Sequence, residues 1–119
     1  MLDAESNHSA AVVGCAGLSL TDDERQLYRE YNPLGFILFA RNVEGPAQVS
    51  RLVDDLRDCV RWADAPVLID QEGGRVARLL SPPWRAAPPA LQIGALYESC
   101  LLYTSDAADE GLGVDLGGR

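Results

Sequence analysis

The stretch PVLIDQEGGRVAR, residues 66–78, decides the fold: a short apolar run ends abruptly in polar residues and two glycines. A continuous apolar run of this length is typical of a buried parallel strand. The carboxyl ends of such strands are where α/β folds place their ligand sites. Asp70 therefore occupies the position of a ligand-binding carboxylate. The residues alone leave open an ordinary turn, in which Asp70 caps a helix and the glycines supply the bend.

The residues after Asp70 suit a polyhydroxylated or anionic ligand. Gly73 and Gly74 allow positive φ and a close approach of the backbone to a ligand. Arg75 and Arg78 add fixed cations with forked donors to the same loop. The sequence thus predicts a binding loop at the end of this strand.

Strands and helices are expected to alternate through the first 69 residues. Candidate strands cover residues 10–16, 35–39 and 66–69. The first helix is predicted to begin with a Thr21–Glu24 capping box and to stop before Asn32-Pro33. This β-α-β-α-β order implies parallel strands joined by right-handed crossovers.

The second helix is expected to begin at Pro46 and to show one apolar face. The apolar positions recur every three or four residues: Val49, Leu52, Val53, Leu56 and Val60. The charged positions fall on the other face and are predicted to be a solvated surface: Asp54, Asp55, Arg57, Asp58 and Arg61.

Four segments, in order, resemble the bacterial β-N-acetylhexosaminidases of glycoside hydrolase family 3. They are GLSLTDDE (17–24), GFILFARN (35–42), IDQEGGRVARL (69–79) and WRAAPPALQIGALY (84–97). The third resembles the family's signature. The other three resemble its entry into the first helix, the end of its second strand, and a proline-containing segment before a short helix.

The resemblance implies an α/β fold, the N-terminal β-α-β-α-β portion of a TIM-type (β/α)8 barrel. Such a barrel needs about 250 residues, whereas the chain has 119, so the barrel is expected to be incomplete. Residues 1–98 are assigned to it. Residues 99–119 are expected to be a non-native tail, because CLLYTSDAADE resembles a translated sequencing adapter.

By the same resemblance, Asp70 hydrogen-bonds hydroxyls of N-acetylglucosamine and Arg78 contributes to substrate binding. An ionised carboxylate and an arginine fork suit those tasks. Four further residues are expected to support the site from behind: Arg41, Asn42, Glu72 and Arg75. Arg41 is expected to pair with a carboxylate such as Glu72.

The implied activity is retaining hydrolysis of terminal β-linked N-acetylglucosamine. In the family an Asp is the nucleophile and a His in a K-H-F-P-G-H-G-D type segment is the acid/base. Neither segment is present here, and His8 is the only histidine. No catalytic residue is therefore assigned to this chain, and no metal or organic cofactor is expected.

Three alternatives remain open. A β-glucosidase-type enzyme of the same family is disfavoured by the QEGGR loop at 71–75. A phosphate- or nucleotide-binding module would need a G-x-G-x-x-G or P-loop pattern, which this loop lacks. A non-catalytic remnant that exposes sheet edges is the third.

Composition narrows the partners and the compartment. The formal net charge is −8, with no basic patch, so nucleic-acid binding is not expected. No apolar run is long enough to span a membrane. Cys15 and Cys59 fall in apolar patterns and are predicted to be reduced core thiols. We expect a cytoplasmic protein whose substrate is a small carbohydrate, an N-acetylglucosamine-containing muropeptide from peptidoglycan recycling.

Overall fold

The computed structural model describes residues 7–99. The chain divides between Ile69 and Asp70 into two compact units, which are described separately below. The predicted boundary at residue 98 stays a prediction. The predicted tail falls almost wholly on residues 100–119, outside the described residues, and its assignment stays a prediction.

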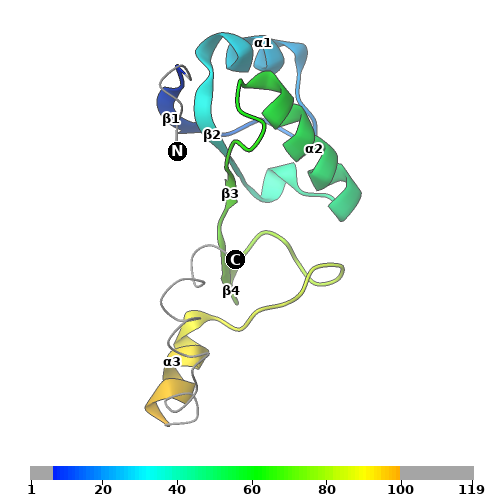
Figure 1. Ribbon diagram of the computed structural model, residues 1–119. Coiled ribbons are helices and arrows are strands. Elements are labelled where there is room, and N and C mark those ends of the chain that lie inside the picture. Colours follow the sequence, from blue (N-terminus) through cyan, green and yellow to red (C-terminus); the bar gives the residue numbers. More distant parts are fainter. Residues whose placement is uncertain (1–6, 100–119) are drawn as a thin grey trace. The chain divides into compact units, whose positions relative to one another are not determined.

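The first unit has the predicted β-α-β-α-β order (Figure 1). Its elements are β1 (Ser9–Val13), α1 (Asp22–Tyr31), β2 (Pro33–Leu38), a 3-10 turn (Ala40–Asn42), α2 (Pro46–Cys59) and β3 (Val67–Ile69). The strands form one sheet in the order β1-β2-β3, and both pairings are parallel. The mixed α/β class with a parallel sheet is therefore confirmed.

The ends of α1 follow from its sequence. The Thr21 side chain accepts from the Glu24 amide, and the Glu24 carboxylate accepts from the Thr21 amide, so the predicted capping box is present. The helix stops at Tyr31, and Asn32 follows in the left-handed region with φ 49°. Pro33, which cannot donate to a helix, then begins β2.

The core lies between the sheet and the two helices. Phe36 of β2 and Leu52 and Leu56 of α2 are at most 1% exposed. Tyr28 of α1 packs edge-on against Phe36, with ring centroids 5.3 Å apart. Leu52 and Leu56 lie on the apolar face predicted for the second helix. Because both helices contribute to one core cluster, they cover the same face of the sheet.

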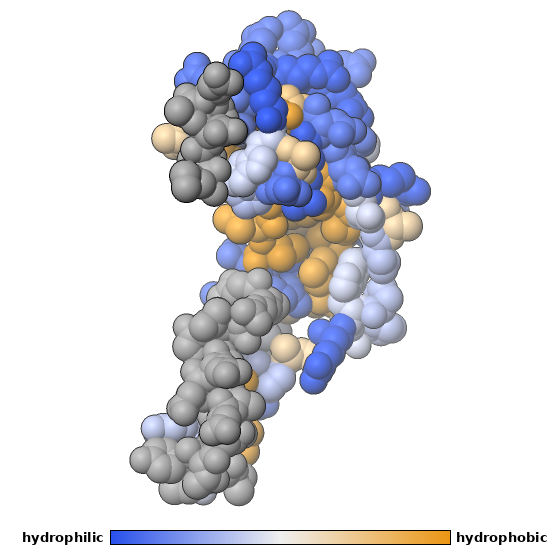
Figure 2. Space-filling model, in the orientation of Figure 1, coloured by the Kyte–Doolittle hydropathy of each residue, from blue (hydrophilic) through white to orange (hydrophobic). Residues whose placement is uncertain are grey.

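Side chains on the other face of the sheet remain accessible. Successive residues of a strand point to opposite faces, so Ile37 points away from the core that contains Phe36 and Leu38. Its cross-strand neighbour Leu68 is 48% exposed and Val12 is 43% exposed. Neither α1 nor α2 covers this set, which we call the open face. Figure 2 shows hydrophobic residues gathered on the surface around β3.

The two cysteines agree with their prediction. Cys15 and Cys59 are free and buried. Burial raises the pKa of both thiols, and Glu24 adds to the rise at Cys15. They are core residues in the thiol form.

The sequence predicts a solvated surface for the charged residues of α2. Two of these residues also contact other parts of the first unit. Asp55 forms an ion pair with Arg25 of α1, with an N–O distance of 3.3 Å. The Nε group of Arg57 donates to the Ala65 carbonyl at 3.0 Å. Both residues stay partly exposed, and their partners are distant in sequence and come near only in the fold.

The second unit holds a small hairpin and a helix. β4 (Gln71–Gly73) pairs antiparallel with β5 (Val76–Ala77), and α3 covers Ala90–Glu98. The short helix agrees with the segment expected after the DQEGG loop. The hairpin replaces the simple turn that was left open for Asp70 and the two glycines. Over residues 7–99, no helix combines the length and apolarity needed to cross a bilayer.

Leu56→Ala should lower the free energy of unfolding by about 2–5 kcal/mol, because it empties a fully buried position. Urea unfolding followed by circular dichroism measures this. The control Leu27→Ala changes a residue that is 56% exposed and should cost about 0.5 kcal/mol or less. Equal losses for both variants would contradict the assigned core.

Candidate functional site

Asn42 ties together the loops that follow β1 and β2. Its side chain is fully buried. The Nδ2 group donates to the carbonyls of Cys15 at 3.1 Å and Gly17 at 2.7 Å, and the Oδ1 atom accepts from the Phe39 amide at 2.9 Å. Every strong bond of this amide is thus spent inside the protein, so Asn42 shapes the loops and is not exposed to a ligand.

Arg41 contacts the same loop after β1 as Asn42 does. Its Nε group donates to the Cys15 carbonyl at 3.1 Å, and its guanidinium lies 4.7 Å from the centroid of the Phe39 ring. Both contacts are made by the guanidinium group, and the residue as a whole remains exposed. Its predicted pairing with a carboxylate such as Glu72 stays a prediction.

Three further side chains fix the loop after β1. The Tyr28 hydroxyl donates to the Gly14 carbonyl at 2.6 Å, and Glu24 accepts from the Ala16 amide at 2.9 Å. Gln48 of α2 donates to the Leu18 carbonyl at 2.8 Å. Partial burial acts to raise the pKa of Glu24, but the hydrogen bonds from Thr21, Ala16 and Tyr28 outweigh it and leave the pKa lowered.

In the second unit, Gln71 holds the hairpin closed. Its Oε1 atom accepts from the amides of Arg78 at 2.9 Å and Leu79 at 3.0 Å, and its Nε2 group donates to the Leu79 carbonyl at 2.9 Å. A single amide side chain therefore binds the strand after β5 back onto β4.

Gly73 and Gly74 make the turn of the hairpin, with φ of 86° and 59°. A Cβ atom on Gly73 would lie 2.8 Å from the Ala87 carbonyl oxygen and closer still to that of Pro88. The Gly74 amide donates to the Ala87 carbonyl at 3.2 Å. Conformation and space therefore both require glycine at position 73.

The hairpin brings Asp70 and Arg78 to its open end, although eight positions separate them. Gln71 is paired with Ala77 in the ladder, and Asp70 and Arg78 are the residues that flank this pair. The Arg78 amide donates to the Gln71 side chain at 2.9 Å. Asp70 is exposed and Arg78 is partly exposed, so both can meet a ligand. Glu72 and Arg75 are exposed on the hairpin itself.

Comparison with known proteins finds sequences similar to this chain. The β-hexosaminidase of Pseudomonas aeruginosa is 48% identical over 63 residues, which are 53% of this chain and 18% of that protein. The chain is a relative of the bacterial β-hexosaminidases. No protein-family model matches it. The aligned part of this chain spans less than a fifth of the Pseudomonas aeruginosa protein.

Solved structures give the same answer for the fold. NagZ from Neisseria gonorrhoeae, in complex with N-trifluoroacetyl-D-glucosamine, superimposes with a TM-score of 0.71 at 24% identity over 78% of this chain and 27% of that one. A glycoside hydrolase family 3 β-N-acetylglucosaminidase from Paenibacillus gives a TM-score of 0.63 at 36% identity, over 77% of this chain and 18% of that one. The resemblance to family 3 hexosaminidases is thereby confirmed.

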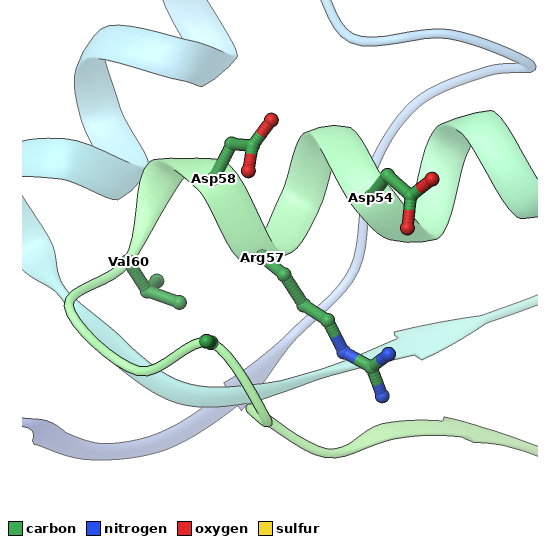
Figure 3. Close-up of a pocket in the computed structure, with 5 residues that line it drawn as sticks. Asp54, Arg57, Asp58 and Val60 are labelled. Atoms are coloured by element: carbon green, nitrogen blue, oxygen red, sulfur yellow. The ribbon is translucent and has the colours of Figure 1, made fainter.

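The first unit of this chain has a hollow at its surface (Figure 3). It measures about 570 Å³ and is lined by Asp54, Arg57, Asp58, Val60 and Ala63, at and just after the end of α2. Arg57 is already committed to the Ala65 carbonyl. None of the predicted site residues lines this hollow, so we do not assign the substrate to it.

The sequence predicted a role for Asn42 near the site, but not the hydrogen bonds by which it joins the loops after β1 and β2. Gln48 and Tyr28 also hold the loop after β1 and were not singled out beforehand. A polar Gln three residues after Gly45, at the start of an apolar-faced helix, is the one signal that pointed to Gln48. Across residues 7–99, no three His, Cys, Asp or Glu side chains are grouped to hold a metal ion.

Asn42→Ala should lower the free energy of unfolding by about 2–4 kcal/mol, because it leaves the Phe39 amide and the Gly17 carbonyl without partners and removes one of two donors to the Cys15 carbonyl. Urea unfolding measures the loss. Gln26→Ala removes an exposed bond to Glu30 and should cost about 0.5 kcal/mol or less. Similar urea midpoints for the two variants would show that the Asn42 hydrogen bonds do not stabilise the fold.

Gly73→Ala should open the hairpin, at a cost of about 1–3 kcal/mol for a strained backbone. Amide hydrogen exchange measures it, and the protected amides of Gly74, Arg78 and Leu79 should exchange faster. Gly94→Ala is the matched control, because a Cβ atom there meets nothing within 4 Å and alanine favours the helix. Unchanged exchange in Gly73→Ala would refute the hairpin.

Proposed function

We propose that this chain carries part of the substrate site of a family 3 β-N-acetylhexosaminidase, which removes terminal β-linked N-acetylglucosamine with retention. The observation that carries the proposal is the hairpin, in which Asp70 and Arg78 flank the paired residues Gln71 and Ala77. In this assignment Asp70 accepts hydrogen bonds from sugar hydroxyls and Arg78 donates to the same sugar. The names of the relatives, β-hexosaminidase and β-N-acetylglucosaminidase, support this substrate class.

The reacting groups belong to other parts of such an enzyme. Retaining hydrolysis needs a carboxylate that attacks the anomeric carbon and an acid/base group that protonates the leaving oxygen and then activates water. The family's histidine segment does not occur in this sequence, and His8 packs against Trp62 with ring centroids 5.7 Å apart. We therefore expect the 119-residue chain by itself to release no N-acetylglucosamine.

The proposal extends to the fold and the domains. Three parallel strands in sequential order, linked by two helices on one face, agree with the beginning of a TIM-type (β/α)8 barrel. Residues 1–98 would form this portion, and residues 99–119 would lie outside it as the adapter-like tail. Arg41, Asn42, Glu72 and Arg75 would support the site by holding its loops.

We also propose the cytoplasm as the compartment and a muropeptide as the natural substrate, within peptidoglycan recycling. Reduced, buried thiols at Cys15 and Cys59 suit a reducing compartment. An N-acetylglucosamine unit in the substrate matches the sugar assigned to Asp70.

A chimera tests the proposal. Residues 9–98 of this chain replace the corresponding segment of the Pseudomonas aeruginosa β-hexosaminidase, and hydrolysis of 4-nitrophenyl N-acetyl-β-D-glucosaminide is followed. The chimera should be active, and Asp70→Asn should lower kcat/KM about 10- to 100-fold, the worth of a hydrogen bond to a charged group. The matching β-glucoside should be hydrolysed poorly.

Asp64→Asn is the control, because Asp64 is also an exposed carboxylate but precedes β3. It should leave kcat/KM within about twofold of the parent chimera. An active chimera that tolerates Asp70→Asn equally well would remove Asp70 from the site. A folded chimera that prefers the β-glucoside would favour the glucosidase alternative.

A further inference from the structure

We propose that Gln71 is a positioning residue of the substrate site. Its side chain fixes the backbone of Arg78 relative to Asp70 and so sets how tightly the sugar is bound. This inference rests on the proposed function, which assigns Asp70 and Arg78 to the sugar. Gln71 makes no contact with the sugar in this assignment and acts through Arg78.

The carboxamide of Gln71 is committed to two consecutive backbone units. Its Oε1 atom accepts from the amides of Arg78 at 2.9 Å and Leu79 at 3.0 Å, and its Nε2 group donates to the Leu79 carbonyl at 2.9 Å. These bonds use both lone pairs of the amide oxygen and one of its two N–H donors. The carboxamide therefore cannot rotate without losing hydrogen bonds, and it holds the Arg78 backbone in one place.

The place of Gln71 in the chain makes this hold a constraint on both proposed sugar ligands. Gln71 follows Asp70 directly, so one peptide bond joins them and their Cα atoms lie about 3.8 Å apart. Its backbone pairs with Ala77, which is the last paired residue of β5. Arg78 lies just beyond the ladder, and the Gln71 side chain binds it there instead of a strand backbone. Gln71 is thus linked covalently to Asp70 and by a hydrogen bond to Arg78.

A fixed backbone matters at Arg78 because an arginine side chain is long and has many rotamers. In the part of the chain that the structure describes, the Arg78 guanidinium takes part in no ion pair, whereas its amide is held by Gln71. The root of the side chain is fixed while its charged end can meet a ligand. A donor whose position is set in advance loses less conformational freedom when the ligand binds, so the ligand binds more tightly.

The experiment uses the chimera that tests the proposed function and the same 4-nitrophenyl N-acetyl-β-D-glucosaminide. Gln71→Leu removes all three side-chain hydrogen bonds at nearly unchanged size. We expect kcat/KM to fall about tenfold, mostly through a higher KM, because contacts to sugar hydroxyls are made before and during the reaction. Gln92→Leu is the matched control, since it makes the same change at an exposed position of α3, and it should stay within about twofold of the parent.

A double-mutant cycle separates positioning from a general effect on the fold. Arg78→Ala alone should lower kcat/KM about 10- to 100-fold, the worth of a hydrogen bond from a charged group. Because Gln71 acts through Arg78, Gln71→Leu should cost no more than about twofold when it is added to Arg78→Ala. Losses that multiply in the double variant would show that Gln71 acts independently of Arg78 and would overturn the inference.

Hydrogen exchange on the full 119-residue chain tests the geometry without any activity. Gln71→Leu should speed exchange of the Arg78 and Leu79 amides at least about tenfold, the effect of losing one hydrogen bond. Unchanged exchange at both amides would overturn the inference, as would a normal kcat/KM for Gln71→Leu beside an impaired Arg78→Ala. If Arg78→Ala itself leaves kcat/KM unchanged, the proposed function loses Arg78 as a sugar ligand and the inference falls with it.

Discussion

The amide of Asn42 is the interaction on which the rest of the first unit depends. Parallel strands leave their carboxyl ends as separate loops, and nothing in a βαβ crossover forces those loops together. Asn42 does so by donating to two carbonyls of the loop after β1 while it accepts from the amide of Phe39. Because the group is fully buried, loss of any partner would leave an expensive polar atom.

The elements that the sequence predicted well are those set by local rules. The Thr21–Glu24 box, the stop at Asn32-Pro33 and the apolar face of α2 depend on residues within four positions of one another. Strand ends were predicted less well. β1 stops at Val13, before the end of its apolar run, because the carbonyls of Cys15 and Gly17 are taken by Asn42.

The hairpin was beyond the reach of the sequence pattern for a physical reason. Its closure needs the Gln71 side chain to meet the backbone of Leu79, and its turn needs space beside Pro88. Both are contacts between residues eight or more positions apart. The motif could therefore point to Asp70 and Arg78 by resemblance, whereas the pairing of Gln71 with Ala77 between them is seen only in the fold.

Gly73 also has a consequence for how this loop can evolve. Any change in the first two bases of a glycine codon adds a Cβ atom, and at position 73 that atom meets the backbone rather than a side chain that could move. Gly45, by contrast, has open space where a Cβ atom would lie. We therefore expect selection to remove substitutions at position 73 and to tolerate them at position 45.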